Sequence, residues 1–240
     1  GKIPDIVAFT RRGHELLLAI EESPKLTIAL LDGLSLGGGS ELALACRAIL
    51  ATPAGSLAFP ETGIGIYPGL GGMLRTARQL GPELAKYYAC TGAPISARDA
   101  FELGLVCRLV EPAAVEAAIA ELAAQGAPDK YRPRPIPERF RVFQALFAPG
   151  PLAELLGGRA PAGFEPAAVE RVLKALRAKA PIALRLACEI IDRQAGLPLR
   201  EAIEVELARL SEIFATADAL EGRSEEHTLN SSHMSISYAV

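Results

Sequence analysis

The chain twice presents a short apolar run, a glycine-rich turn and a helix pattern, in that order. In the first unit an apolar run at residues 26–31 is followed by the glycine triplet at 37–39 and an Ala- and Leu-rich stretch. In the second unit an apolar run at residues 64–67 precedes the glycine-rich segment 69–72 and another helix pattern. Short apolar runs with β-branched residues indicate buried strands, and glycine clusters indicate turns. The repetition predicts an α/β fold in which strands lead directly into helix N-termini.

The rest of the chain carries mostly helical periodicity, with apolar residues recurring every three to four positions. A second extended segment is predicted at residues 49–59 and a strand at 105–110. Residues 125–166 are rich in Pro, Gly and Arg, so we expect an irregular segment with one short helix at 142–147. Further helices are expected at residues 6–20, 97–104, 113–124, 167–179, 181–194 and 199–214.

These patterns divide the chain into four parts. Residues 1–125 are expected to form the α/β core, residues 126–165 an irregular Pro- and Gly-rich insertion, and residues 166–222 a helical region. Residues 223–240 differ from the body in composition and are ordered like translated sequencing-adapter DNA, which predicts an artificial or disordered tail. The chain starts at Gly1 within a helix pattern, so we expect an N-terminal portion to be missing.

Composition excludes several classes of protein. Half of the residues are hydrophobic, and a net charge of −3 with scattered Lys and Arg provides no basic surface for nucleic acid or an anionic membrane. Four widely spaced cysteines in apolar runs match neither a disulfide framework nor a zinc site, which predicts no metal and a reducing, cytoplasmic location. No apolar stretch reaches the length of a membrane span, and no signal peptide is evident. A small soluble substrate is therefore the expected partner.

Two glutamates and the first glycine triplet are the candidate chemical groups. Unpaired N–H groups and the positive end of the helix dipole allow the turn at 37–39 to bind an anion or a developing oxyanion. Glu41 lies in the first turn of the same helix among apolar residues, and Glu61 follows Pro60, which fixes the approach of the chain. Each feature also has a structural explanation. Glycine turns are commonly structural, the dipole favours an acid in the first turn, and a glutamate in a loop is commonly solvated.

Three sequence blocks, in order and at matching spacing, resemble the crotonase, or enoyl-CoA hydratase/isomerase, superfamily. The family patterns are NGxxxGGGxELALxCD, FxxPEvxxGxxPGxGG and TGxxixAxeAxxxGLV, and the corresponding segments here are DGLSLGGGSELALAC, LAFPETGIGIYPGLGG and TGAPISARDAFELGLV. The C-terminal helix patterns resemble those of the family as well. The resemblance implies a crotonase-like spiral of ββα units with a helical oligomerisation region, assembled as a homotrimer or hexamer.

The resemblance also implies roles for individual residues. The middle glycine of the triplet, here Gly38, donates one oxyanion-hole N–H to the thioester carbonyl. Glu41 and Glu61 match the paired base and acid, and the N–H of Gly69 matches the group that places the catalytic water. The implied reaction is the reversible addition of water to a 2-enoyl-CoA to give a 3-hydroxyacyl-CoA, as in fatty acid β-oxidation. No separate cofactor is implied, because coenzyme A is part of the acyl-CoA substrate.

Alternatives within and outside this family remain open. The family's isomerases tend to keep only the Glu after Pro, and its 3-hydroxyacyl-CoA thioester hydrolases have an acid at the position of Gly69, so Glu41 and Gly69 favour a hydratase. A nucleotide-binding module is disfavoured because neither glycine segment continues as GxGxxG or GK[ST]. The family's first oxyanion donor lies in an upstream GAD-like loop that has no match before Gly37. We therefore expect weak activity from these 240 residues alone.

Overall fold

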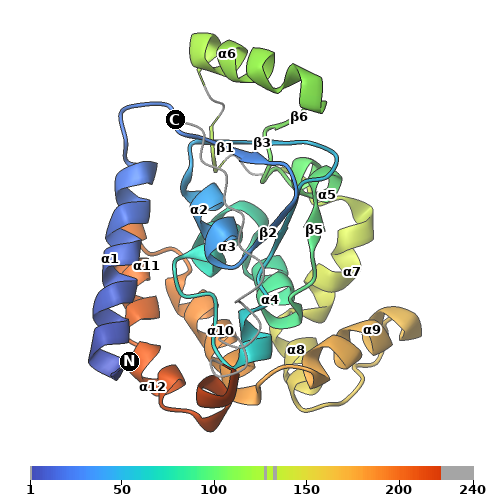
Figure 1. Ribbon diagram of the computed structural model, residues 1–240. Coiled ribbons are helices and arrows are strands. Elements are labelled where there is room, and N and C mark those ends of the chain that lie inside the picture. The colour runs from blue at the N-terminus through green and yellow to red at the C-terminus, as the bar shows by residue number, and fades with distance from the viewer. Residues whose placement is uncertain (1, 127–128, 132–133, 223–240) are drawn as a thin grey trace.

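The structure, a computed structural model, describes residues 2–126, 129–131 and 134–222 (Figure 1). Two small sheets lie in the upper half of this view, and helices pack beneath and around them. The strands are β1 (Ile28–Leu31), β2 (Leu34–Leu36), β3 (Ala48–Ala51), β4 (Ser56–Ala58), β5 (Ile95–Ser96) and β6 (Arg108–Leu109). The helices are α1 (Ile3–Glu21), α2 (Gly38–Ala45), α3 (Gly72–Leu80), α4 (Pro82–Thr91), α5 (Ala97–Glu102), α6 (Val115–Gln125), α7 (Glu138–Leu146), α8 (Pro149–Leu156), α9 (Pro166–Arg177), α10 (Pro181–Gln194), α11 (Leu199–Leu207) and α12 (Leu210–Phe214), with 3-10 segments η1 (Glu61–Ile64) and η2 (Pro112–Ala114).

Successive strands are shared between two three-stranded sheets. One sheet has the order β1-β3-β6, and both of its strand pairs are parallel. In the other, of order β2-β4-β5, strand β2 is parallel and β5 antiparallel to β4. Two strands from different sheets followed by a helix therefore make a unit that occurs twice, as β1-β2-α2 and as β3-β4-α3. The predicted α/β class is confirmed, and the first glycine turn leads from a strand into a helix as predicted, whereas the second glycine segment follows η1 and irregular chain.

The extended segment predicted at residues 49–59 is two strands, not one. The chain turns between β3 and β4, where the Gly55 N–H donates to the Thr52 carbonyl over 2.9 Å. A Cβ at residue 55 would lie 2.4 Å from the Leu31 carbonyl oxygen, so the turn can cross β1 only with glycine at this position. The hydropathy pattern could not show the break, because β3 and β4 are both largely buried.

Of residues 64–67, predicted as a strand, Ile64 is the last residue of η1 and residues 65–67 follow it as irregular chain. Pro60 precedes the turn with φ −79° and ψ −2°, and Gly65 ends it with φ +80°. Thr62 is fixed within it, because its Oγ1 donates to the Ala89 carbonyl of α4 over 3.1 Å. Such long-range hydrogen bonds outweigh a short apolar run, and they leave no trace in the local pattern.

The described residues contain more helices than the sequence predicted, and one predicted helix is divided in two. Helix α4 was not predicted, and residues 126–165 contain α7 and α8 instead of one short helix in an irregular segment. Phe143 of α7 is buried and stacks on Tyr87 of α4, with ring centroids 4.4 Å apart. The single helix predicted at 199–214 is divided into α11 and α12, and the tail predicted at 223–240 lies outside the described residues.

The positions of the prolines explain why the helices within residues 126–165 were not predicted. Pro lies in the first turn of α8, α9 and α10, where a missing N–H breaks no helical hydrogen bond. Within residues 125–166 we interpreted such prolines as evidence against helix, whereas Pro149 and Pro166 begin α8 and α9.

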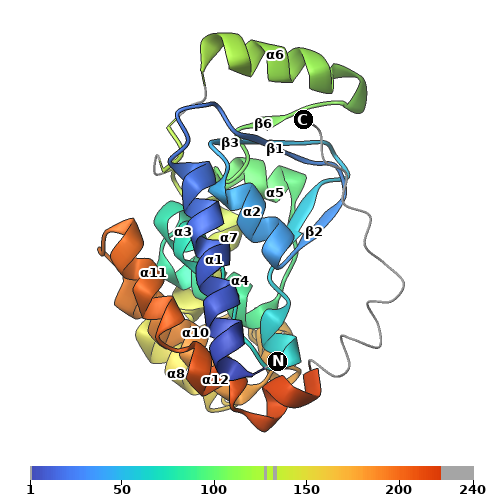
Figure 2. The same cartoon turned by 60° about the vertical axis from the view of Figure 1, so that its left-hand side comes forward.

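Helix α1 encloses the side of the molecule on which α2 and α11 lie (Figures 1 and 2). Its buried face consists of Thr10, His14, Leu17 and Leu18. Helix α2 is a core helix, and Ser40 and Glu41 are buried on it together with its apolar residues. Polar side chains of α1 and α2 are thus enclosed between helices instead of being hydrated.

Three findings concern the cysteines, membrane spans and metal sites of the described residues. All four cysteines are free, and the Sγ atoms of Cys90 and Cys188 lie 3.5 Å apart in the core. Within the described ranges no helix has the length and apolar character that a bilayer crossing requires. The same ranges contain no group of three or more His, Cys, Asp or Glu residues placed to hold a metal ion.

Candidate active site

The first glycine turn brings β2, β4 and α2 together. Gly37 has φ +49° and ψ −119°, and its N–H donates to the Ala58 carbonyl at the end of β4 over 3.0 Å. Gly38 is the first residue of α2, so its N–H has no partner in the preceding turn of helix. A Cβ added at Gly38 would meet no atom within 4 Å. The predicted oxyanion donor therefore lies at a helix N-terminus with open space beside it.

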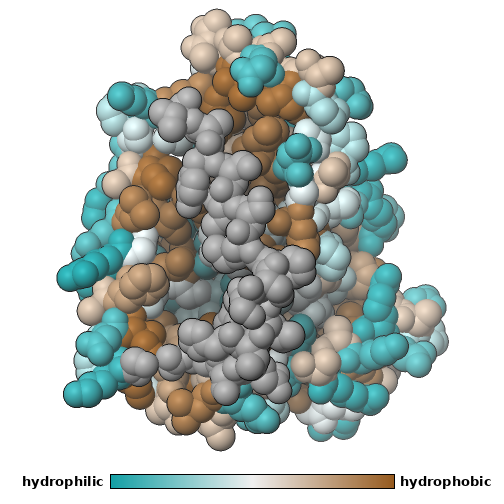
Figure 3. Space-filling model, viewed as in Figure 1, coloured by the Kyte–Doolittle hydropathy of each residue, from teal (hydrophilic) through white to brown (hydrophobic). Residues whose placement is uncertain are grey.

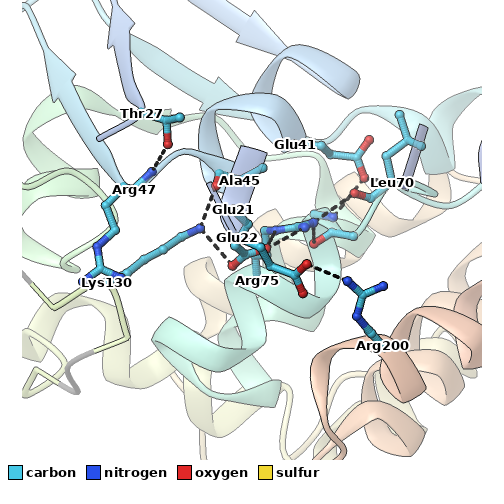
Figure 4. A network of polar contacts seen from close by, with 12 residues as sticks. Glu21, Glu22, Thr27, Glu41, Ala45, Arg47, Leu70, Arg75, Lys130 and Arg200 are labelled. Carbon is cyan, nitrogen blue, oxygen red and sulfur yellow. Dashed lines mark hydrogen bonds and ion pairs between the residues drawn. The ribbon is translucent and has the colours of Figure 1, made fainter. Parts of the chain in front are cut away.

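Glu41 extends from the first turn of α2 towards the second glycine segment, 69–72. Its side chain is 2% exposed. The Oε1 atom accepts hydrogen bonds from the backbone N–H groups of Leu70, at 2.8 Å, and Gly72, at 2.9 Å (Figure 4). The two glycine segments of the sequence are therefore joined through one carboxylate.

Burial is the main influence on the acidity of Glu41. Removal from water disfavours its charged form, and the negative charge of Glu206 acts in the same direction. The N–H groups of Gly72 and Leu70 and the charge of His14 oppose both effects. The balance raises the pKa of Glu41 to about 7, which is the range in which a carboxyl group can both accept and return a proton at neutral pH.

Glu61 lies on the other side of the same glycine turn. It begins η1 and is 9% exposed. Its Oε1 would be 2.7 Å from a Cβ at Gly37, so the carboxylate packs directly against the Cα of that glycine. Glu41 donates its backbone N–H to the Gly37 carbonyl over 3.0 Å. Both predicted glutamates thus contact Gly37, which brings together residues twenty positions apart in the sequence.

Lys179, just after α9, lies beside Glu61. A Cβ at Gly92 would lie 3.0 Å from its Nζ and a Cβ at Gly63 3.3 Å from it, which places the ammonium group between α4 and η1. Burial lowers the pKa of Lys179, and the charge of Glu61 opposes that shift. The second glutamate therefore has a cation as its neighbour, where Glu41 has a second carboxylate.

The loop that holds Glu41 is itself fixed by a buried arginine. Arg75 of α3 is 1% exposed, and its Nη1 donates to the carbonyls of Leu70, at 3.1 Å, and Gly71, at 3.3 Å. Its Nε donates to Glu21 of α1 over 2.9 Å (Figure 4). Gly69 precedes these residues, after Pro68, in the same loop. The loop is therefore held through both its N–H and its carbonyl groups.

Sequence reasoning missed several residues that surround the site. His14, Lys179 and Glu206 were not predicted, because each comes from an element far from the three recognised blocks, and Arg75 was not predicted although it follows the second block by three residues. One signal was present for Glu206. Buried positions of α11 are Ala202, Ile203, Glu206 and Leu207, so this acid lies on the apolar stripe of its helix.

Comparison with known proteins gives consistent results for the family and for the fold. Residues 2–227 match the family described as enoyl-CoA hydratase/isomerase. A Bacillus subtilis protein described as an enoyl-CoA hydratase/isomerase is 41% identical over 123 residues, which are 51% of this chain and 46% of that protein. A crotonyl-CoA hydratase of Syntrophomonas wolfei is 40% identical over 104 residues, covering 43% of this chain and 40% of that enzyme. The matched segments span less than half of either relative.

Solved structures show the same architecture. An enoyl-CoA hydratase from Rhodobacter sphaeroides superposes with a TM-score of 0.76 at 27% identity, covering 97% of this chain and 69% of that one. A carnitinyl-CoA dehydratase from Mycobacterium thermoresistibile superposes with a TM-score of 0.72 at 22% identity, covering 95% of this chain and 72% of that one, and shows the likeness of fold. The crotonase-like fold that the three sequence blocks implied is confirmed.

Proposed function

Because the chain belongs to the enoyl-CoA hydratase/isomerase family, we propose that it adds water reversibly to the double bond of a 2-enoyl-CoA thioester to give a 3-hydroxyacyl-CoA. One observation carries this proposal. The Glu61 carboxylate packs against Gly37, Glu41 lies one helical turn beyond Gly37 on α2, and the helix-terminal N–H of Gly38 follows directly in the chain. Two acid–base groups and an oxyanion donor at one turn are what hydration of a conjugated thioester requires.

The proposed reaction assigns one proton to each glutamate. Water attacks Cβ of the enoyl group while Glu41 takes one of its protons, and the π electrons move towards the thioester carbonyl as an enolate. Glu61 then gives a proton to Cα, so that H and OH have been added across the double bond. The two carboxyl groups recover their starting states by proton exchange with solvent, and dehydration follows the same steps in reverse.

Glu41 is assigned as the base because it matches the position of the base in the family pattern that the chain resembles. Its raised pKa leaves it ionised in much of the protein near neutral pH while keeping it basic enough to deprotonate attacking water. The N–H of Gly69 lies in the loop bound by Glu41 and is assigned to holding that water. Because the two carboxyl groups share one site, the pH dependence of hydration belongs to the pair and not to either residue alone.

Gly38 is assigned to stabilising the enolate. A backbone N–H aimed at the developing oxyanion contributes about 3 to 4 kcal/mol to catalysis. The positive end of the α2 dipole acts on the same oxygen. Glycine at this position leaves the approach to the amide open, since no atom lies within 4 Å of its missing Cβ.

The test is incubation of crotonyl-CoA with the protein expressed from its complete open reading frame. Hydration converts crotonyl-CoA to 3-hydroxybutyryl-CoA and removes the enoyl absorbance. Release of free coenzyme A from 3-hydroxyacyl-CoA, or movement of the double bond in 3-enoyl-CoA without hydration, would assign the thioester hydrolase or isomerase reaction instead. The variant E41Q, assayed in parallel, separates turnover at this site from contaminating hydratase.

We also propose the expected assembly and location. A homotrimer or hexamer is supported by apolar surface, which gathers on the face shown in Figure 3. Exposed apolar side chains of the described residues include Phe9, Leu16, Leu34 and Leu36. Light scattering of the complete protein tests this assembly, and a stable monomer would contradict it.

A cytoplasmic location is supported by the four free cysteines. No cofactor is proposed apart from the coenzyme A of the substrate.

A further inference from the structure

Glu41 shares its loop with a second buried carboxylate, Glu206 of α11. The N–H groups of Leu70 and Gly72 donate to Glu41, whereas the N–H of Gly71 between them donates to Oε1 of Glu206 over 2.8 Å. Glu206 is 0% exposed. Three consecutive amides are thus divided between two carboxylates from helices far apart in the sequence, and movement of either carboxylate shifts the donors of the other.

Glu206 is held on several sides and anchors the loop at two points. Its backbone carbonyl accepts a hydrogen bond from the Tyr67 hydroxyl over 2.7 Å, just before the loop, and its carboxylate binds Gly71 within the loop. Its Oε2 accepts from Nε2 of Gln194 over 3.3 Å. Nε2 of His14 lies 3.2 Å from its Oε1. A shift of Glu206 would therefore displace the segment that carries the donors to Glu41.

The charges that face Glu41 come from four surrounding elements. Glu206 of α11 raises its pKa, and His14 of α1 lowers it. Arg75 of α3 faces the loop carbonyls but is paired with a glutamate of α1 at 2.8 Å. Glu61 of η1 lies across Gly37. Glu206 is thus the acidic group that reaches the Glu41 side of the loop from the helical half of the chain.

We infer that Glu206 is a positioning residue for Glu41, fixing the amides that bind it and placing a second negative charge behind it. A buried carboxylate is costly unless it is compensated, and Glu206 has as partners an amide, a histidine and a glutamine side chain. The role in hydration rests on the proposed function of Glu41, whereas the coupling of the two carboxyl groups does not require turnover.

The variant E206Q tests this inference, because it keeps an acceptor for the Gly71 amide and removes the charge. Infrared titration measures the absorption band of the protonated Glu41 carboxyl group, which is identified as the band that is absent from E41Q. In E206Q we expect its midpoint to move about one pH unit lower, since a like charge has been removed. The acidic limb of the pH profile of kcat/KM for crotonyl-CoA should move in the same direction, with KM changed less than kcat.

The variant H14N should shift the Glu41 midpoint in the opposite direction. Replacing His14 removes the group whose charge lowers the pKa of Glu41, so the infrared midpoint should move to higher pH. General loosening of the core would move both variants in the same direction. E204Q is the matched control, because Glu204 lies on the same helix and also pairs with α1, through Arg11 at the surface. We expect its midpoint and its activity to equal those of the parent.

The outcomes separate this inference from the proposed function. An unchanged Glu41 midpoint in folded E206Q overturns the positioning role, even if crotonyl-CoA is hydrated. If E206Q does not fold, an unchanged or lowered midpoint in H14N has the same consequence. If the infrared midpoints move in opposite directions but the complete protein hydrates no enoyl-CoA, the proposed function fails and the coupling of Glu206 to Glu41 stands.

Discussion

Glu41 and Glu61 contact the same glycine, yet their surroundings differ in almost every respect. Glu41 is enclosed by α1, α2, α3 and α11, binds two backbone amides and has a second carboxylate near it. Glu61 begins a short 3-10 turn, remains partly accessible and has Lys179 as its charged neighbour. The chain thus places two identical side chains beside neighbours of opposite charge.

This difference suggests why the site needs two glutamates instead of one. A base must lose its proton while an acid keeps one, and two carboxyl groups in matching surroundings would not sort themselves into these roles. Burial and Glu206 favour proton retention by Glu41, the residue assigned as the base, and Lys179 places a positive charge beside Glu61, the residue assigned as the acid, so these neighbours alone do not account for the assignment. The roles assigned to Glu41 and Glu61 can therefore be separated by changing one set of neighbours at a time.

The largest expected effect comes from removing either carboxyl group. E41Q and E61Q each keep the shape of the side chain and lose its proton-transfer chemistry, so we expect kcat for crotonyl-CoA hydration to fall by about a hundredfold to ten-thousandfold in each. KM should change much less. Steady-state kinetics of the complete protein measure both values. Retention of near-parental kcat in E41Q would show that its buried carboxyl is structural and would leave Glu61 as the active member.

Removing the oxyanion donor should slow hydration whichever glutamate acts as the base. G38P deletes the N–H at the first helical position, where proline is sterically tolerated, and we expect kcat to fall by about a hundredfold to a thousandfold. G38A is the matched control, because it keeps the N–H and its Cβ meets no atom within 4 Å. Circular dichroism and thermal melts establish that both variants are folded. Equal activity of G38P and G38A would contradict the assignment of this amide.

The third prediction concerns stability and distinguishes Glu41 from Glu61. The pKa of Glu41 rises from its ordinary value of 4.5 to about 7 in the folded state, so the folded chain holds a proton that the unfolded chain loses. Its contribution to stability is complete below pH 4.5 and is lost as the pH rises to about 7. E41Q should therefore gain up to about 3 kcal/mol over the parent at pH 8 relative to pH 4.

Urea unfolding of the parent, E41Q and E61Q at both pH values measures this gain. The difference between parent and E41Q cancels the titrating groups that do not interact with Glu41. E61Q should show a smaller pH-dependent change, because Lys179 and not a second carboxylate lies beside Glu61. A gain in E61Q as large as that in E41Q would abolish the contrast between the two surroundings.

Local sequence predicted several residues of this candidate site but not the charged neighbours that distinguish Glu41 from Glu61. The glycine turn and helix pattern singled out the segment 37–39, Glu41 and Glu61, whereas the roles of Gly38 and Gly69 are what the family resemblance implies. The contrasting neighbours are Glu206 and Lys179, which reach the site from the second half of the chain through packing between elements. Amphipathic periodicity predicted their helices without predicting which face would meet α1 or η1.

The same limit explains the errors in the fold. The α4 helix, the division of residues 49–59 and the helices within 126–165 depend on packing or on one close approach, as at Gly55. Proline and glycine signals were ambiguous in these places, because both residues mark helix ends as well as irregular chain. Blocks that combine a turn with its chemistry were predictable, whereas the contacts between blocks required the structure.

The smallest expected effect comes from the charged neighbour of Glu61. K179M removes the cation beside this carboxylate, so Glu61 should keep its proton to higher pH. If Glu61 is the acid in hydration, the alkaline limb of the kcat/KM profile moves upward by about half to one pH unit, and the acidic limb, which reports Glu41, stays in place. K179R retains the charge and should leave both limbs unchanged. A shift of the acidic limb in K179M would mean that the surroundings of Glu41 and Glu61 are not independent. The assignment of Glu41 as base and Glu61 as acid would then have to be reversed or abandoned.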